Sequence, residues 1–491
     1  MKNYFASDYS YWDACKNNQY YWLVKLMNKR GSHVSPFTSH DYMRHNRVNA
    51  KCVYRIIPFQ NSFVFSLGYI CTPNKHMITI TPFNALRPEA QYAKLVASKP
   101  YDVLNSKEAK VEAQGNPYSF LHITKSEIDL PENTDPYSQK VYDKAKENLD
   151  AFISRNVLFK ENKHCYYIYQ LVMPDKLNTG NDHVQTGLVC CSSIDDYEND
   201  LIKKHEFTRP DKELDRINHI KTTGAQTGNV FLAYKNVEEI DAIINKWKKE
   251  RSAVYVFISD DIIQHTIWII NDEETITKIS SLFKEKVPCT YIADGHHRAA
   301  SAAKAREFFG EDAAPAKNFL TTLFPSDQLK IMEYNRVIKD LNGLSANDFL
   351  QKTEENFLVE KIEKAFLPDM PHSFGMYFHQ QWYKLSAKEN TFSNDPIGVL
   401  DITILHNNLL QPVLGIGDQR TDKRIDFIGG IRGLGELENR VNSGDMAIAF
   451  SLHPVSVQQL FDIANSGNVM PPKSTWFEPK LRDGLLTHLI V

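Results

Sequence analysis

The chain has 491 residues, 42% of them hydrophobic and 24% charged, which is the composition of a globular protein with room for two or three domains. The formal net charge of −3 provides no global basic field, so nucleic acid is not an expected partner. No stretch offers the roughly 18 consecutive apolar residues that a membrane helix needs, and the N-terminus lacks the apolar segment of a secretory signal.

Seven cysteines occur, and none of them shows C-x-x-C spacing. Cys190 and Cys191 are adjacent in the apolar run GLVCCSSI, which predicts buried core thiols and neither a zinc site nor a disulfide framework. A reduced, cytoplasmic protein is therefore expected.

Residues 1–76 differ in character from the remainder of the chain. They are rich in Tyr, Asn, His and Cys, and neither a helical nor a two-residue period persists. One strand is expected at 63–71, whereas from Met77 onward an alternating strand leads through a loop into a helix. We predict that 1–76 is an N-terminal extension, disordered or not native, with a genuine accessory segment as the alternative.

From Met77 onward, strands and helices are interspersed. The predicted elements are a helix at 140–156, strands at 164–173 and 186–194 that would pair as a hairpin, a helix at 236–251, and a hairpin from AVYVFISD and HTIWIIND. This pattern predicts an α+β fold of compact mixed sheets with helices. We assign 77–330 to a nucleotide-binding, catalytic region and 331–491 to a C-terminal α/β region of the same unit.

The segment YIADGHHRAASAAKAR (291–306) places five polar residues between a predicted buried strand and an alanine-rich helix. Backbone N–H groups and the helix dipole favour anions at such a point. Gly295 would let the backbone approach a ligand, and the next three residues, His296, His297 and Arg298, would add donors and positive charge. The alternative is an ordinary helix capped by the preceding aspartate, with exposed histidines.

A second polar cluster is HEFTRPDKELDR (205–216). It contains the cations Arg209, Lys212 and Arg216 and the carboxylates Glu206 and Glu213. A helix that begins near the proline would place two of the cations on one face, where they could bind phosphate oxygens while a carboxylate accepts a proton. The alternative is a solvated helix face whose salt bridges each contribute under about 1 kcal/mol.

Two shorter segments carry candidate ligand groups. In GAQTGNVF (224–231), glycines bracket Gln226 and Thr227, so the loop would present N–H groups and a hydroxyl; a tight turn explains it equally well. In PYDVLNSKEA (100–109), Asp102 either caps the following helix or serves as a carboxylate ligand.

Seven segments in this order resemble one bacterial family that is catalogued as a conserved domain of unknown function and is often encoded beside serine-biosynthesis genes. They are PFNALRP (82–88), KPYDVL (99–104), NPYSFLHI (116–123), KKHEFTRPDKELDR (203–216), AQTGNVFL (225–232), ADGHHR (293–298) and PPKSTWFEPKL (471–481). The resemblance covers about 77–491.

The ADGHHR segment also resembles the phosphate-binding motif of the ParB/sulfiredoxin superfamily, which includes free-serine kinases. The resemblance implies a ParB/sulfiredoxin-like nucleotide-binding element in which Asp294, Gly295, His296, His297 and Arg298 hold a nucleoside triphosphate or diphosphate. ATP is the preferred nucleotide, with Mg²⁺ assigned to Asp294.

Together these features predict a nucleotide-dependent small-molecule kinase that phosphorylates free L-serine to O-phosphoserine. Such transfer requires mainly positioning and charge neutralisation. Glu206 is the expected base and Glu213 its rival, while Asp294, His296 and His297 assist catalysis. The anchoring residues for substrate or phosphate are Arg209, Lys212, Arg216, Gln226 and Thr227.

The alternative function is a nucleotide-binding regulatory or DNA-associated ParB-like protein without kinase activity. The near-neutral charge and the lack of a basic helix-turn-helix segment count against it. A sulfiredoxin-like transfer to a cysteine is disfavoured because Cys289 lies within the predicted strand. The sequence leaves open the donor, the acceptor and the oligomeric state, including a homodimer.

Overall fold

The computed structural model describes residues 22–24, 50–59, 62–71, 77–174, 182–310 and 313–491. Met1–His76 and Met77–Val491 are separate compact units. In the first unit, β1 (Trp22–Val24), β2 (Ala50–Phe59) and β3 (Ser62–Cys71) pair antiparallel in the order β1-β3-β2. The strand predicted at 63–71 is β3. Most residues of the segment 1–76, which we predicted to be disordered or not native, lie outside the residues that the structure describes.

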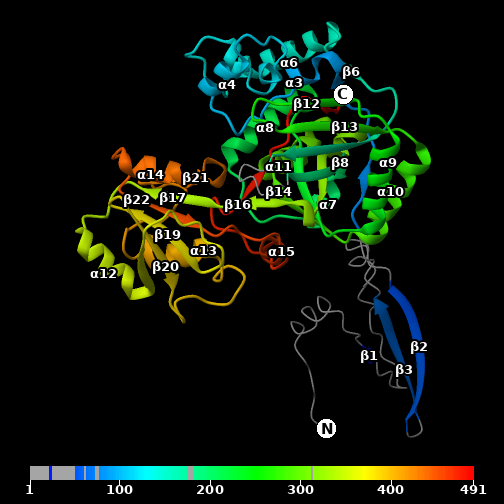
Figure 1. The fold of residues 1–491 in the computed structure, drawn as a ribbon. Coiled ribbons are helices and arrows are strands. Elements are labelled where there is room, and N and C mark those ends of the chain that lie inside the picture. Colours follow the sequence, from blue (N-terminus) through cyan, green and yellow to red (C-terminus); the bar gives the residue numbers. More distant parts are fainter. Residues whose placement is uncertain (1–21, 25–49, 60–61, 72–76, 175–181, 311–312) are drawn as a thin grey trace. The chain divides into compact units, whose positions relative to one another are not determined.

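A nine-stranded sheet forms the centre of the first half of the Met77–Val491 unit (Figure 1). Its strands are β4 (Ile80–Thr81), β7 (Tyr166–Met173), β8 (His183–Ser193), β9 (Ile202–Lys203), β11 (Val230–Tyr234), β12 (Tyr255–Ile258), β13 (Gln264–Ile270), β14 (Thr290–Asp294) and β15 (Asn318–Pro325). The order is β12-β13-β7-β8-β15-β11-β14-β9, with β4 paired to β8. Only the β11–β15 and β14–β9 pairs are parallel. Both predicted hairpins are confirmed, as β7–β8 and β12–β13.

Both faces of this sheet are covered by apolar cores, and for this reason the sequences of its strands are continuous apolar runs. Successive side chains point to opposite faces. Tyr166 and Cys190 pack in the core on one face, and Tyr167 and Cys191 in the core on the other. Burial raises the pKa of the Cys190 thiol to about 12, and both thiols are free and buried, so the prediction of core thiols is confirmed.

Three long helices contribute to the core on one face of the sheet: α9 (Glu238–Glu250), α10 (Glu273–Lys286) and α11 (His296–Phe309). The alanines of α11 allow the helix to approach the strands closely, and several of them are buried there. The helix α8 (Pro210–Thr223) begins at Pro210, as predicted, and packs against α11. In turn α6 (Gln139–Ser154), the helix predicted at 140–156, packs against α8.

Shorter elements complete this half of the unit. They are α3 (Ala93–Val96), α4 (Ser106–Ala113), α5 (Leu121–Thr124), α7 (Ile194–Glu198), and the paired strands β5 (Leu86–Pro88) and β6 (Leu158–Lys160). Asn105 caps α4 with a capping box, so Asp102 is not the cap of that helix.

A six-stranded antiparallel sheet forms the centre of the second half. Its strands, in sheet order, are β18 (Phe357–Ile362), β20 (Gln381–Ala387), β19 (Ser373–Phe378), β22 (Ile448–Leu452), β17 (Tyr334–Ile338) and β21 (Ile425–Gly429). The helices of this half are α12 (Ala346–Asn356), α13 (Asp401–Leu405), α14 (Leu434–Asn442) and α15 (Val457–Asn465). The predicted α+β fold with mixed sheets is confirmed.

The C-terminal segment, residues 470–491, connects the two halves. Its strand β23 (Trp476–Glu478) pairs with β16 (Lys330–Met332), and β24 (His488–Leu489) pairs with β10 (Ala225–Gln226). Between them, Asp483 bridges Ser98. The segment therefore carries polar side chains from the six-stranded half to the edge of the nine-stranded half. In the described part of the chain, no helix has the length and apolar character needed to cross a membrane.

The buried His219 of α8 predicts a specific pH dependence of stability. Its Nε2 donates to the Ile123 carbonyl at 3.0 Å, and burial, reinforced by Arg216, lowers its pKa to about 4. Because the unfolded chain regains a pKa of about 6.5, it binds a proton that the folded protein does not, and stability falls as the pH drops from about 6.5 toward 4.

The free energy of unfolding in urea should therefore fall less in His219→Gln than in the wild type when the pH is lowered from 7.5 to 5.5. We expect the difference between the two decreases to be about 1 kcal/mol. The wild-type protein, measured in parallel, provides the reference pH dependence. A His219→Gln protein with that same dependence would contradict the assignment.

Candidate functional site

The first turn of α11 lies at the end of β14, so the ADGHHR segment occupies a strand-to-helix turn, as predicted. Gly295 is the N-cap with φ of 94°, and no side chain caps the helix. A Cβ at this position would lie 3.4 Å from the Val230 Cα. The backbone N–H groups of the first turn are thus left without a capping side chain, which favours an anion there. Asp294 does not act as the N-cap.

Substituting this glycine should cost stability, because a left-handed backbone strains any residue with a Cβ by about 1–2 kcal/mol. We expect Gly295→Ala to lower the free energy of unfolding in urea by about that amount. Gly115, whose φ is 78° and whose Cβ would meet nothing within 4 Å, gives a variant with the same strain away from the site. A Gly295→Ala protein as stable as wild type would contradict the backbone geometry.

Burial disfavours the charged form of both histidines of the turn, which were predicted from the sequence to supply positive charge. His296 is buried, and its ring stands edge-on to His205 with centroids 4.5 Å apart. Burial, and then the neighbouring His205 and His297, lower the pKa of His296 well below its usual value. Burial also lowers the pKa of His297, whose Nε2 accepts a bond from the Arg209 backbone N–H at 2.9 Å. These rings supply hydrogen bonds in place of charge.

Arg298 connects three segments of the chain around the turn. One guanidinium nitrogen lies 2.9 Å from each carboxylate oxygen of Asp102 and 3.6 Å from Asp294, and the other donates to the Asn229 carbonyl at 2.5 Å. Burial alone would raise the pKa of Asp102, but Arg298 and Lys480 hold it below its usual value. Arg298 therefore positions the loops that surround the helix N-terminus.

The C-terminal segment contributes two residues that the sequence analysis did not assign. The Lys480 ammonium lies 3.5 Å from Asp294. Asp483 is 2% exposed, and burial raises its pKa to about 7 despite the nearby Arg298. The signal was present in the sequence, because these residues lie in or directly after PPKSTWFEPKL.

A pocket lies beside α11. Its polar lining includes Arg216, Arg298, Gln226 and Thr227, and its other walls include Tyr101, Ile220, Val230 and Phe319. The Arg216 guanidinium lies over the Tyr101 ring at 4.1 Å. The structure therefore brings four of the predicted site residues to one cavity with aromatic and apolar walls.

The side chain of Gln226 also forms hydrogen bonds that hold the loop at this pocket in place. Its side-chain amide donates to the Asn318 carbonyl at 3.2 Å and accepts from the Leu320 N–H at 2.8 Å. Both bonds are made to β15, so the amide fixes the GAQTG loop against the sheet. Thr227, the other residue of the pair, also lines this pocket.

The structure distinguishes the two candidate bases by their partners. Glu206 is 53% exposed and lies 3.7 Å from the Nδ1 of His296, and the surrounding atoms raise the pKa of its carboxyl. Glu213 is buried and accepts bonds from Thr208 and Lys304, which lower its pKa against the effect of burial. Glu213 is committed to holding α8 on α11, while Glu206 is able to accept a proton.

Two of the predicted anchoring cations lie away from the cavity. Arg209 is exposed and pairs with Asp211 at 2.8 Å. Lys212 donates to the Tyr137 hydroxyl at 2.8 Å. Their side chains interact on the surface of α8, where salt bridges contribute little.

The carboxylates nearest the α11 N-terminus fit a magnesium ion that arrives with phosphate oxygens. Within the described residues, no group of three or more His, Cys, Asp or Glu side chains is placed to hold a metal ion. Asp102 and Asp294 nevertheless both lie against the same nitrogen of Arg298. Mg²⁺ is usually bound through one or two carboxylates together with substrate phosphates, which suits this pair.

Fold and site thus define a mixed α+β protein with an uncapped helix N-terminus beside a cavity lined by arginines. A sequence model of the family described as "Protein of unknown function (DUF1015)" matches residues 80–403. The match spans more than half of the chain, and the chain belongs to this family. No curated protein matches it.

Several solved structures are similar to this chain. A free serine kinase in complex with AMP is 11% identical, covering 60% of this chain and 91% of its own, with a TM-score of 0.31. A conserved hypothetical protein from Pyrococcus furiosus is 13% identical, with coverages of 61% and 94% and a TM-score of 0.31. SbnI with a C-terminal truncation, from Staphylococcus aureus, is 10% identical, with coverages of 60% and 85% and a TM-score of 0.31.

Proposed function

We propose that this protein is a nucleotide-dependent phosphotransferase whose acceptor is a small hydroxyl compound, with free L-serine preferred. The observation that carries the proposal is the uncapped, glycine-initiated N-terminus of α11. Free N–H groups and a helix dipole at that point suit a phosphate chain, and the apolar and aromatic walls of the neighbouring pocket suit the nucleoside. These two features support the expectation, drawn from ADGHHR, of a ParB/sulfiredoxin-like nucleotide element.

In the proposed reaction, Glu206 accepts the proton of the acceptor hydroxyl, whose oxygen then attacks the terminal phosphorus of the nucleotide. The bond between that phosphorus and its bridging oxygen breaks, and the shortened nucleotide leaves with the electron pair. The first-turn N–H groups and the neutral His296 and His297 rings donate hydrogen bonds to the phosphoryl oxygens. Mg²⁺, when held by Asp294 and the phosphates, neutralises part of their charge.

ATP is the proposed donor, and serine the proposed acceptor. Serine is chosen because the ADGHHR segment resembles that of free-serine kinases. Arg216 and Thr227, at the cavity wall, are the proposed anchors for the substrate or phosphate. Glu206 is proposed over Glu213 because the latter is already bound by Lys304 and Thr208.

The test is a product assay on the full-length chain. The protein is incubated with Mg²⁺, a pool of free amino acids, and ATP, ADP, CTP or GTP in separate reactions, and mass spectrometry detects the gain of one phosphate. We expect O-phosphoserine from one donor. Absence of any phosphorylated amino acid with all four donors would contradict the proposal; tight nucleotide binding without product would support the regulatory alternative.

A further inference from the structure

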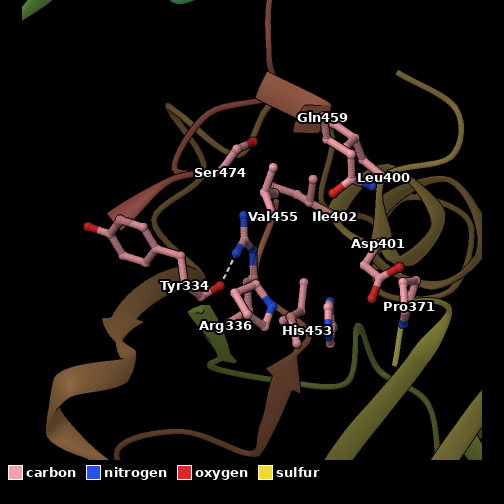
Figure 2. A pocket seen from close by; sticks show the side chains of 12 residues that line it. Tyr334, Arg336, Pro371, Leu400, Asp401, Ile402, His453, Val455, Gln459 and Ser474 are labelled. Atoms are coloured by element: carbon pink, nitrogen blue, oxygen red, sulfur yellow. Dashed lines mark hydrogen bonds between the residues drawn. The ribbon is translucent and has the colours of Figure 1, made fainter. Parts of the chain in front are cut away.

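A second pocket lies in the six-stranded half of the unit, and Figure 2 shows its lining. Side chains from β17, α13, α15 and the C-terminal segment converge on it. Its lining includes the polar residues Arg336, Asp401, Gln459 and Ser474 and the apolar residues Leu400 and Val455. None of these residues takes part in the site at the α11 N-terminus.

Arg336 is a buried cation without an anionic partner in the described part of the chain. Its side chain is 1% exposed, and its terminal nitrogens donate to the carbonyls of Tyr334 and, at 2.9 Å, of Lys473. Its Nε has no hydrogen bond, and the ring of Phe427, 5.4 Å away, offers only a weak compensation for the charge. Burial lowers its pKa to about 9. A guanidinium buried in this way is costly unless an anion completes the site.

Asp401 provides an acidic group on another wall of the same cavity. Its side chain is 8% exposed. One carboxylate oxygen accepts from the His372 N–H at 2.8 Å, while the other has no hydrogen bond. Burial raises its pKa to about 7. The cavity thus presents an uncompensated donor from Arg336 and an uncompensated acceptor from Asp401.

We propose that this cavity binds a small zwitterion of the α-amino-acid type, with its carboxylate toward Arg336 and its ammonium group toward Asp401. Figure 2 shows the Arg336 and Asp401 side chains apart from each other, with Val455 and Ile402 drawn between them. A simple anion would complete Arg336 and leave Asp401 unpaired, and a simple cation would do the reverse. A zwitterion satisfies both, and the apolar walls accommodate its side chain.

The test is calorimetric titration of the full-length chain without nucleotide. The ligands are the L-amino acids, propionate and lactate as carboxylates without an amine, ethanolamine as an amine without a carboxylate, and inorganic phosphate. We expect at least one amino acid to bind, and the analogues that lack either charged group to bind at least tenfold more weakly. Failure of every amino acid to bind, or phosphate or propionate binding as tightly as the best amino acid, would overturn the proposal.

Variants locate the binding. Asp401→Asn preserves the shape of the side chain and should weaken amino-acid binding at least tenfold, as should Arg336→Gln; circular dichroism checks that each variant is folded. If Arg336→Gln does not fold, the affinity of Asp401→Asn and the titrations with the analogues decide whether the proposal holds. Arg420→Gln, at an exposed pair with Asp418, should leave the affinity unchanged. Unchanged affinity in Asp401→Asn would overturn the proposal.

Glu206→Gln separates this cavity from the site of proposed phosphoryl transfer. Amino-acid binding at the second cavity should be unaffected by that change, whatever the protein's activity toward serine. If Glu206→Gln abolished the binding, the amino acid would occupy the α11 site and the proposal would be wrong.

Discussion

Replacing Arg298 by methionine is expected to lower the free energy of unfolding by about 3–5 kcal/mol, because removal of one partner leaves a buried charge unpaired. Arg298 is 7% exposed and lies against Asp102 and Asp294, and its charge also interacts electrostatically with Asp483. Without the guanidinium these carboxylates repel one another, and the loops around the α11 N-terminus lose their common anchor. Nucleotide affinity should fall with stability. Urea denaturation and calorimetric titration measure the two effects.

Two further variants test this explanation. Arg298→Met combined with Asp102→Asn removes both members of the pair and should recover part of the lost stability, as a double-mutant cycle would show. Arg306→Met, in the same helix, removes a more exposed arginine that pairs with Asp195 and Glu198, and should cost under about 1 kcal/mol. An Arg298→Met loss as small as the Arg306→Met loss would contradict the positioning assigned to Arg298.

Replacing Glu206 by glutamine is expected to reduce turnover by about 10²–10⁴-fold, the usual contribution of a positioned general base. The variant keeps the shape of the side chain and removes its ability to accept a proton, so nucleotide binding should persist. Because partial desolvation by the surrounding protein atoms raises the pKa of the Glu206 carboxyl, wild-type turnover should rise with pH through a value above that of an ordinary glutamate. Steady-state rates measured over a pH series give this rise in turnover and its apparent pKa.

The matched control for Glu206 is Asp211, an exposed carboxylate in the first turn of the neighbouring α8. Asp211→Asn should retain wild-type turnover and its pH dependence. If Glu206→Gln behaved in the same way as Asp211→Asn, Glu206 would not be the base, and Glu213 would have to leave Lys304 to take its place.

The fold was predictable from sequence wherever local period and turn chemistry agree. The β7–β8 and β12–β13 hairpins, the helix that begins at Pro210 and the strand-to-helix turn at Gly295 all follow from such local signals. Strand order did not follow, because it depends on contacts between distant segments. The parallel pairing of β11 with β15, for example, joins residues about 90 positions apart in the sequence.

For the site, residue chemistry was easier to predict than surroundings. The sequence singled out ADGHHR and the 205–216 cluster, and the structure places Glu206 beside His296. The sequence alone could not show that Glu213 is held by Lys304 or that burial disfavours the charged form of the histidines. Both depend on neighbours that other segments of the chain supply. For the same reason Lys480 and Asp483, which reach the site only through the path of the C-terminal segment, went unassigned.

The central claim is that the α11 N-terminus binds nucleotide phosphates, and a calorimetric series with adenosine, AMP, ADP and ATP in Mg²⁺ tests it most directly. The account predicts that affinity increases with the number of phosphates, and that Gly295→Ala reduces this increase whereas Gly115→Ala, which carries the same backbone strain elsewhere, does not. Adenosine binding as tightly as ATP, or equal ATP affinities in the two glycine variants, would contradict it.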